Sequence, residues 1–139
     1  MKKLSSQIRP AALVLALIIA PFSLQARGFF PDLGLQVNRV DARSFEVIEA
    51  RGAGARDIWC AAARYAIALG RDRGRIWVAE ARGPARTVSG ATGVVFTTEA
   101  VEGARSSVSV TVRRVGENLL INHALQFCRD RIRGREDGL

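Results

Sequence analysis

The sequence predicts an α+β fold in which an antiparallel sheet of four to five strands carries two helices on one face. Three observations lead to this prediction. Several short segments alternate apolar and polar residues with the period of two that is typical of strands. Two longer segments place apolar residues at helical spacing. Each of these longer segments contains one of the two cysteines of the chain, Cys60 and Cys128, so a bond between them would join the helices.

The N-terminal segment, residues 1–26, has the order of a cleavable signal peptide. Two lysines form a basic start, an apolar run occupies residues 11–20, and Ala26 is the small residue before the expected cut. Pro21 ends the apolar run after about ten residues, whereas a membrane-spanning helix needs about 20. We therefore expect a periplasmic or secreted protein that does not span a membrane after cleavage.

Cleavage leaves residues 27–139, enough for one small α+β domain. Of the 21 basic residues two lysines and one arginine are removed, which leaves 18 arginines against 13 acidic residues and a net charge of +5 instead of +8. Residues 27–35 contain glycine, proline and the pair Phe29-Phe30, which predicts an irregular lead-in with aromatic rings packed on the domain. Residues 134–139 are expected to form a frayed tail.

Five segments are predicted as strands, and with the helices they give the order ββαβββα. The first two form a hairpin closed by Asp41-Ala42-Arg43, and the third ends before a turn at Gly83-Pro84. In the last segment valines alternate with serines and threonines, which predicts a sheet with one polar face. The strand candidates are residues 36–40, 44–49, 76–80, 92–98 and 107–115.

The first helix is predicted over residues 55–69, where Gly70 is typical of the position just past a helix end. Its apolar residues occupy two nearly opposite faces, so we expect it to be buried between the sheet and another element. The second helix is predicted from residue 117 or 118 to Arg133. Its apolar stripe comprises Ile121, Ala124, Leu125, Cys128 and Ile132.

Two cysteines in an exported chain indicate a disulfide, and one pairing is available to them. The bond between Cys60 and Cys128 would close a loop of about 68 residues, worth roughly 4 kcal/mol on the chain-entropy model. The spacing excludes a CxxC redox pair and a clustered metal site, so no metal or other cofactor is expected.

His123 is the single histidine of the chain. Metal sites built on several histidines are therefore excluded, and any catalytic triad would have to use His123 as its base. The expected second helix places His123 between Leu119 and Phe127 on an outer face. This contact strip, Leu119-His123-Phe127, is either a plain helix surface or a partner surface. The carboxylates form no convincing acid/base pair, although Glu99 and Glu102 flank one loop, and no catalytic residue is assigned.

Arginine clusters are the most suggestive feature that remains. Guanidinium groups suit bidentate capture of phosphate or carboxylate, which an envelope protein meets on lipids and cell-wall polymers. Acidic residues are interleaved with the arginines, so a solvated surface is the alternative. The candidate anion-binding residues are Arg71, Arg73, Arg75, Arg129, Arg131 and Arg133.

These features favour an exported, disulfide-stabilised protein of the bacterial envelope that binds a protein or an anionic envelope component without catalysing a reaction. The alternative is an enzyme inhibitor or a hydrolase of the envelope. Nucleic acid is not an expected partner, because the chain is exported and has no aromatic-basic RNA-binding motif.

Overall fold

The computed structural model describes residues 28–29, 34–105 and 107–136, with side chains as far as Asp130 in the last helix. The predicted signal peptide lies outside these residues, as does Phe30. The expected order ββαβββα is found, although its last strand lies elsewhere in the chain. The elements are β1 (Val37–Arg39), β2 (Ser44–Ile48), α1 (Ala55–Ala68), β3 (Arg75–Pro84), β4 (Thr92–Thr97), β5 (Asn118–Leu120) and α2 (Ile121–Glu136).

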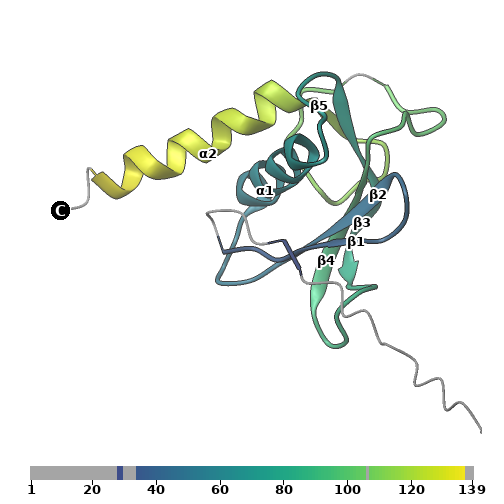
Figure 1. Cartoon of the computed structure of the whole chain (residues 1–139), viewed down its shortest axis with the longest axis horizontal. Coiled ribbons are helices and arrows are strands. Elements are labelled where there is room, and N and C mark those ends of the chain that lie inside the picture. The colour runs from purple at the N-terminus through teal and green to yellow at the C-terminus, as the bar shows by residue number, and fades with distance from the viewer. Residues whose placement is uncertain (1–27, 30–33, 106, 137–139) are drawn as a thin grey trace, which may run out of the picture.

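The five strands form one antiparallel sheet in the order β1-β2-β4-β3-β5. Helix α1 lies on one face of this sheet, and α2 packs beside α1 and then extends beyond it (Figure 1). Cys60 and Cys128 form a disulfide with their Cα atoms 5.2 Å apart. The predicted α+β fold, its two helices and its disulfide are therefore confirmed.

Helix α1 ends one residue before its predicted end and is buried on two sides. Eight of its fourteen residues are buried, because its apolar side chains face both the sheet and α2. Ile67 and Leu69 were expected on these faces as well, but they are 40% and 50% exposed. They lie at the end of the helix, where the chain turns away toward β3.

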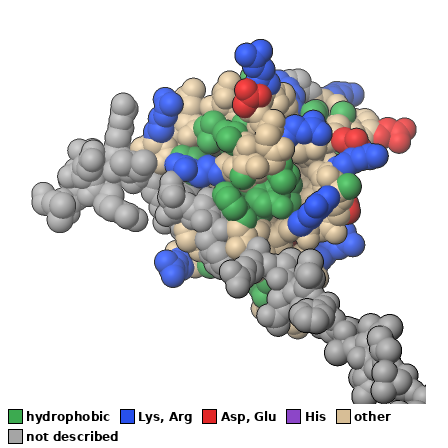
Figure 2. Space-filling model, in the orientation of Figure 1, with side chains coloured by type: hydrophobic (Ala, Val, Ile, Leu, Met, Phe, Trp, Pro, Cys, Tyr) green, Lys and Arg blue, Asp and Glu red, His purple; other side chains and the backbone are tan. Residues whose placement is uncertain are grey.

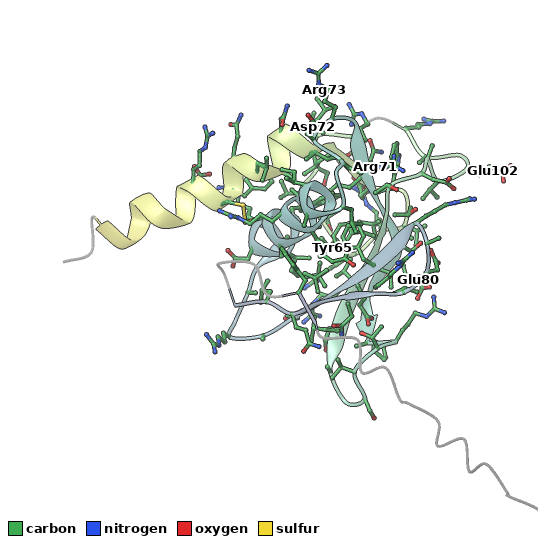
Figure 3. The ribbon with its side chains drawn as sticks, viewed as in Figure 1. Tyr65, Arg71, Asp72, Arg73, Glu80 and Glu102 are labelled. Atoms are coloured by element: carbon green, nitrogen blue, oxygen red, sulfur yellow. A yellow bond between two sulfur atoms is a disulfide. The ribbon has the colours of Figure 1, made fainter. Side chains whose placement is uncertain are left out.

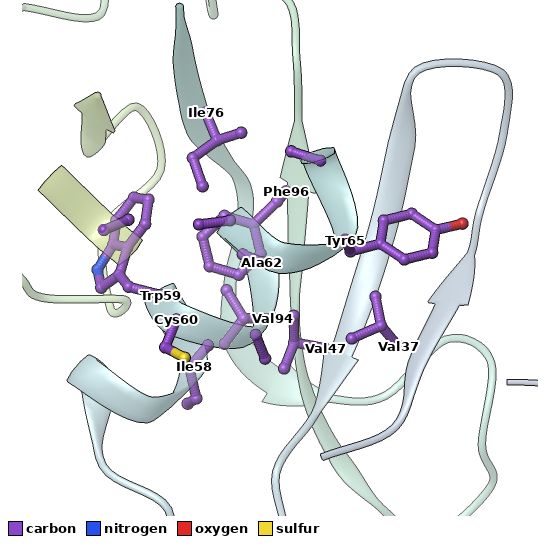
Figure 4. Close-up of a cluster of buried hydrophobic side chains, with 14 of the residues drawn as sticks. Val37, Val47, Ile58, Trp59, Cys60, Ala62, Tyr65, Ile76, Val94 and Phe96 are labelled. Carbon is purple, nitrogen blue, oxygen red and sulfur yellow. The ribbon is translucent and has the colours of Figure 1, made fainter. Parts of the chain in front are cut away.

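Aromatic rings fill the space between α1 and the sheet (Figure 4). Tyr65 on the helix contacts Phe45, with ring centroids 4.7 Å apart, and Phe29, at 5.4 Å. Phe96 lies 6.0 Å from Phe45 and 4.9 Å from Trp59. Such pairs add about 0.5–1.5 kcal/mol each to the gain from buried area. For Phe29, the predicted packing of the lead-in is confirmed.

Residues 107–115 do not form the predicted strand. The hydroxyl groups of Ser107, Ser109 and Thr111 each accept a hydrogen bond from the backbone N–H two residues further on, at 3.0, 3.3 and 3.3 Å. Such local bonds offer the backbone an alternative to a sheet ladder. The expected buried face is also interrupted, because Val108 is 86% exposed. The alternation of the sequence thus reflects spaced hydroxyl groups rather than a strand.

The last strand is β5, in a segment for which the start of the second helix was predicted. The amide group of Asn118 donates to the backbone oxygens of Arg105 and Gly116, and its oxygen accepts from Arg75 at 2.8 Å. These bonds hold the chain extended beside β3, so α2 starts only at Ile121. Because α2 continues to Glu136, residues 134–136 belong to the helix and not to a frayed tail.

A turn was predicted at Gly83-Pro84, but both residues belong to strand β3, which ends at Pro84. Register shifts between Val78 and Glu80 and between Glu80 and Gly83 mark irregularities along it. Proline is tolerated at this end because strand ends do not need every N–H of the ladder. The turn itself is made by residues 85–91, which connect β3 to β4.

A buried carboxylate lies on the sheet face opposite the helices. Glu46 is 1% exposed and accepts hydrogen bonds from the backbone N–H groups of Arg86 and Thr87 and from the Thr87 hydroxyl. Asn38 in turn donates to the Thr87 hydroxyl oxygen at 2.8 Å. A Cβ on Gly93 would lie 2.7 Å from the carboxylate, so glycine leaves room for it. These bonds hold the 85–91 turn over the sheet.

Removing the disulfide is expected to lower the free energy of unfolding by about 4 kcal/mol, because the bond closes a long loop in the unfolded chain. Urea unfolding of the Cys60→Ala/Cys128→Ala variant would measure the loss. Reductant should destabilise the wild-type protein and leave this variant unchanged. An equal response of both proteins would contradict the assigned role of the bond.

Replacing the buried carboxylate by Glu46→Gln is expected to cost about 1.5–3 kcal/mol, because charge-assisted bonds are lost and an amide N–H₂ group meets N–H donors. The matched control is Glu99→Gln, at an exposed carboxylate paired with Arg43, which should leave stability unchanged within error. Urea unfolding at neutral pH compares the two. A control as destabilising as Glu46→Gln would refute the role of burial.

Candidate anion-binding pocket

A pocket of about 170 Å³ opens between the turn from β1 to β2 and the C-terminal end of α1. Three arginines, two hydroxyl-bearing residues and one buried tyrosine line it. Segments far apart in the sequence therefore meet at one place. The lining residues are Arg39, Asp41, Ala42, Arg43, Ser44, Tyr65, Leu69, Arg71 and Thr98.

The turn between β1 and β2 is ordered by Asp41. Its Oδ1 accepts hydrogen bonds from the backbone N–H groups of Arg43 and Ser44, both at 2.8 Å, as in an Asx turn. The Nε–H of Arg39 donates to the backbone oxygen of Asp41 at 2.8 Å. The pKa of Asp41 is lowered, chiefly by the hydrogen bond from the Arg43 N–H, so this carboxylate is ionised at neutral pH.

The end of α1 supplies the opposite wall. Gly70 has φ +81° and its N–H bonds to the oxygen of Ile67, while the N–H of Arg71 bonds to the oxygen of Ala66. This pair of bonds is a Schellman motif, which turns the chain sharply at the helix end. The motif fixes the direction in which Arg71 leaves the helix.

Tyr65 is the most deeply placed residue of the pocket, 9% exposed. Its ring belongs to the aromatic cluster under α1, which holds it in place. Its hydroxyl forms no hydrogen bond within the described part of the chain. Because a phenol can both donate and accept, Tyr65 adds a hydrogen-bonding group to the pocket lining.

The pocket lining carries three arginines and one carboxylate, that of Asp41. Arg43 forms an exposed ion pair with Glu99 at 2.8 Å, whereas Arg71 forms no ion pair with a described residue. Figure 2 shows hydrophobic side chains gathered in the middle of one face of the molecule, with basic side chains spaced around them. Guanidinium and phenol groups are suited to bind a carboxylate or phosphate.

The predicted arginine cluster after α1 does not converge on one site. Arg71 lines the pocket, but Arg73 projects outward from the turn (Figure 3). Arg75 lies in β3 and donates to the Asn118 side chain at 2.8 Å. The pocket instead joins Arg71 to Arg39 and Arg43, two residues that the sequence did not single out.

The arginines near the C-terminus are spaced along α2. Arg129 is exposed, and the side chains of Arg131 and Arg133 lie outside those described. Of this second predicted cluster, Arg129 is therefore the member whose side chain the structure describes.

The predicted contact strip does not form on an outer helix face. Leu119 lies in β5 and is 1% exposed, because the helix starts after it. Phe127 is also buried and lies 5.5 Å from the guanidinium carbon of Arg56. His123 is exposed, with its ring 5.5 Å from that of Phe127. Of the three predicted residues, only His123 is therefore exposed, and it lies beside the buried ring of Phe127.

A second pocket of about 200 Å³ lies at the N-terminal end of α1. There Arg82 binds the Glu49 carboxylate through two hydrogen bonds, 2.5 and 2.8 Å long. The side-chain bond from Arg82 lowers the pKa of Glu49. Arg113 also lines this pocket, but the paired Arg82 and Glu49 occupy it with matched charges, which makes it a weaker candidate for an anion than the pocket at Tyr65.

Within the ranges that the structure covers, no three His, Cys, Asp or Glu side chains are grouped to hold a metal ion. None of the described helices is long and apolar enough to cross a membrane. Glu99 is paired with Arg43, and Glu102 projects from a loop at the right of Figure 3, away from Tyr65.

Comparison with known proteins adds no assignment, since no family model, curated protein or solved structure matches this chain.

Proposed function

We propose that this chain is an exported, disulfide-stabilised binding protein of the bacterial envelope, whose pocket at Tyr65 takes an anionic group. The observation that carries the proposal is that Arg39, Arg43 and Arg71 line one pocket together with Tyr65, whose hydroxyl has no described hydrogen-bond partner. Charge-assisted hydrogen bonds from such groups are stronger than neutral ones.

The volume of the pocket limits what enters it. Pockets for drug-sized ligands measure roughly 300–1,000 Å³, and this one measures about 170 Å³. It therefore suits a small anion or a terminal anionic group presented by a larger molecule. Carboxylates and phosphates of this kind occur on peptides, lipids and cell-wall polymers.

The lining argues for binding rather than catalysis. It contains neither histidine nor cysteine, and its one carboxylate is Asp41. A general acid or base works best with a pKa near the operating pH, but the pKa of Asp41 is lowered. The pocket therefore offers groups for recognition, and its remaining acid/base group is the Tyr65 phenol.

Binding is expected to depend on Arg71 and not on Arg73, its neighbour outside the pocket. Inorganic phosphate and acetate, titrated at low salt and followed by NMR shifts, serve as probes. Arg71→Ala should weaken binding about tenfold, because a charge-assisted bond is lost, whereas Arg73→Ala removes the same charge as a control. Equal weakening by both variants would indicate general charge attraction, and no binding by the wild type would refute the proposal.

Export is supported by the signal-peptide pattern of residues 1–26 and by the disulfide, which is typical of oxidising compartments. When the full chain is expressed in a Gram-negative host, the osmotic-shock fraction should contain it. Intact mass should give a chain starting at Arg27. Recovery from the cytoplasm with Met1 or Lys2 at its N-terminus would contradict export.

A further inference from the structure

A carboxylate within a pocket for anions requires an explanation. Asp41 lines the pocket beside Arg39, Arg43 and Arg71, and a negative charge there repels a simple anion. Its turn-forming bonds use Oδ1, which receives the N–H groups of Arg43 and Ser44. A carboxylate has about four lone-pair sites, so acceptor capacity remains.

Besides the hydrogen bond from the Arg43 N–H, the charge of Arg43 helps to lower the pKa of Asp41, but the guanidinium groups of Arg39 and Arg43 are engaged elsewhere. Arg43 pairs with Glu99, and the Nε–H of Arg39 is directed to the backbone oxygen of Asp41. Across the described ranges, the Asp41 carboxylate forms no salt bridge. The hydrogen bond from the Arg43 N–H keeps its pKa low and hence its charge in place. The pocket thus presents a negative group and the uncommitted Arg71 together.

From this pairing of opposite charges we propose that the ligand is a small zwitterion, with its ammonium group at Asp41 and its anionic group at Arg71 and Tyr65. The inference rests on the proposed anion-binding role of the same pocket and narrows its ligand. For a plain anion the charge of Asp41 is unfavourable and its value lies only in ordering the turn, whereas a zwitterion gains a second charge-assisted contact from it.

The remaining lining fits a short molecule. Leu69 supplies an apolar wall, and Ser44 and Thr98 supply hydroxyl groups. At about 30 Å³ per water, the volume corresponds to roughly five or six waters. Two sources offer this chemistry: an amino acid, with ammonium and carboxylate, and an aminoalcohol phosphate such as a lipid headgroup.

The test compares four probes on the folded mature protein with its disulfide intact: alanine, phosphoethanolamine, propionate and ethylamine. Binding is followed by the NMR shifts of the backbone amides in the β1 to β2 turn. At least one zwitterion should bind about tenfold more tightly than propionate and ethylamine, a gain typical of one charge-assisted bond. Whether alanine or phosphoethanolamine binds better identifies the source.

The matched variant is Asp41→Asn, since asparagine can keep the Asx turn through its side-chain oxygen. Its zwitterion affinity should fall to the level of propionate, while propionate binding stays equal or improves. Propionate binding as tightly as both zwitterions, or unchanged zwitterion affinity in Asp41→Asn, would overturn the inference and leave anion binding intact. No binding of any probe, together with none of phosphate or acetate, would overturn both.

Discussion

Helix α1 carries buried side chains on two opposite sides, so it must be covered both by the sheet and by α2. This constraint determines the positions of most other parts. It places Trp59 and Tyr65 against Phe96 and Phe45 of the sheet, and Cys60 against Cys128 of α2. Once α1 is enclosed, the direction of its last turn and the position of Arg71 are fixed as well.

The pocket follows from this arrangement rather than from a local motif. The ring of Tyr65 packs in the aromatic core, and the same residue lines the pocket. The β1 to β2 turn reaches the same place because Phe45, in β2, packs against that ring. The pocket and the fold therefore share the aromatic cluster, and a change in core packing would be felt at the pocket.

The sequence was sufficient for the parts whose pattern is local. The first helix, its glycine stop, the first hairpin and the cysteine pair each depend on periodicity or on one residue type. The strand prediction for residues 107–115 was wrong because spaced serines and threonines give the same alternating pattern as a strand. Here their hydroxyl groups bond to the backbone of their own segment. Asn118 was read as a helix start because its partners, Arg75 and the Arg105 oxygen, are far away in sequence.

The candidate site was found from sequence only in part, for the same reason. Arg71 was singled out with its sequence neighbours, but the structure joins it to Arg39 and Arg43 through the fold. Glu46, between two apolar residues of β2, had the pattern of a solvated strand residue. Its burial depends on the 85–91 turn, which folds over it from a distant part of the sequence. Such contacts leave no periodic signal.

Residues 107–115, which do not form a strand, also bear on how the protein avoids aggregation. Exposed N–H groups along an extended segment invite pairing with another chain and hence aggregation. Here the N–H groups of Ser109, Thr111 and Arg113 are already bonded to hydroxyl groups of the same segment. An extended stretch rich in valine is thus kept from recruiting further strands by its own side chains.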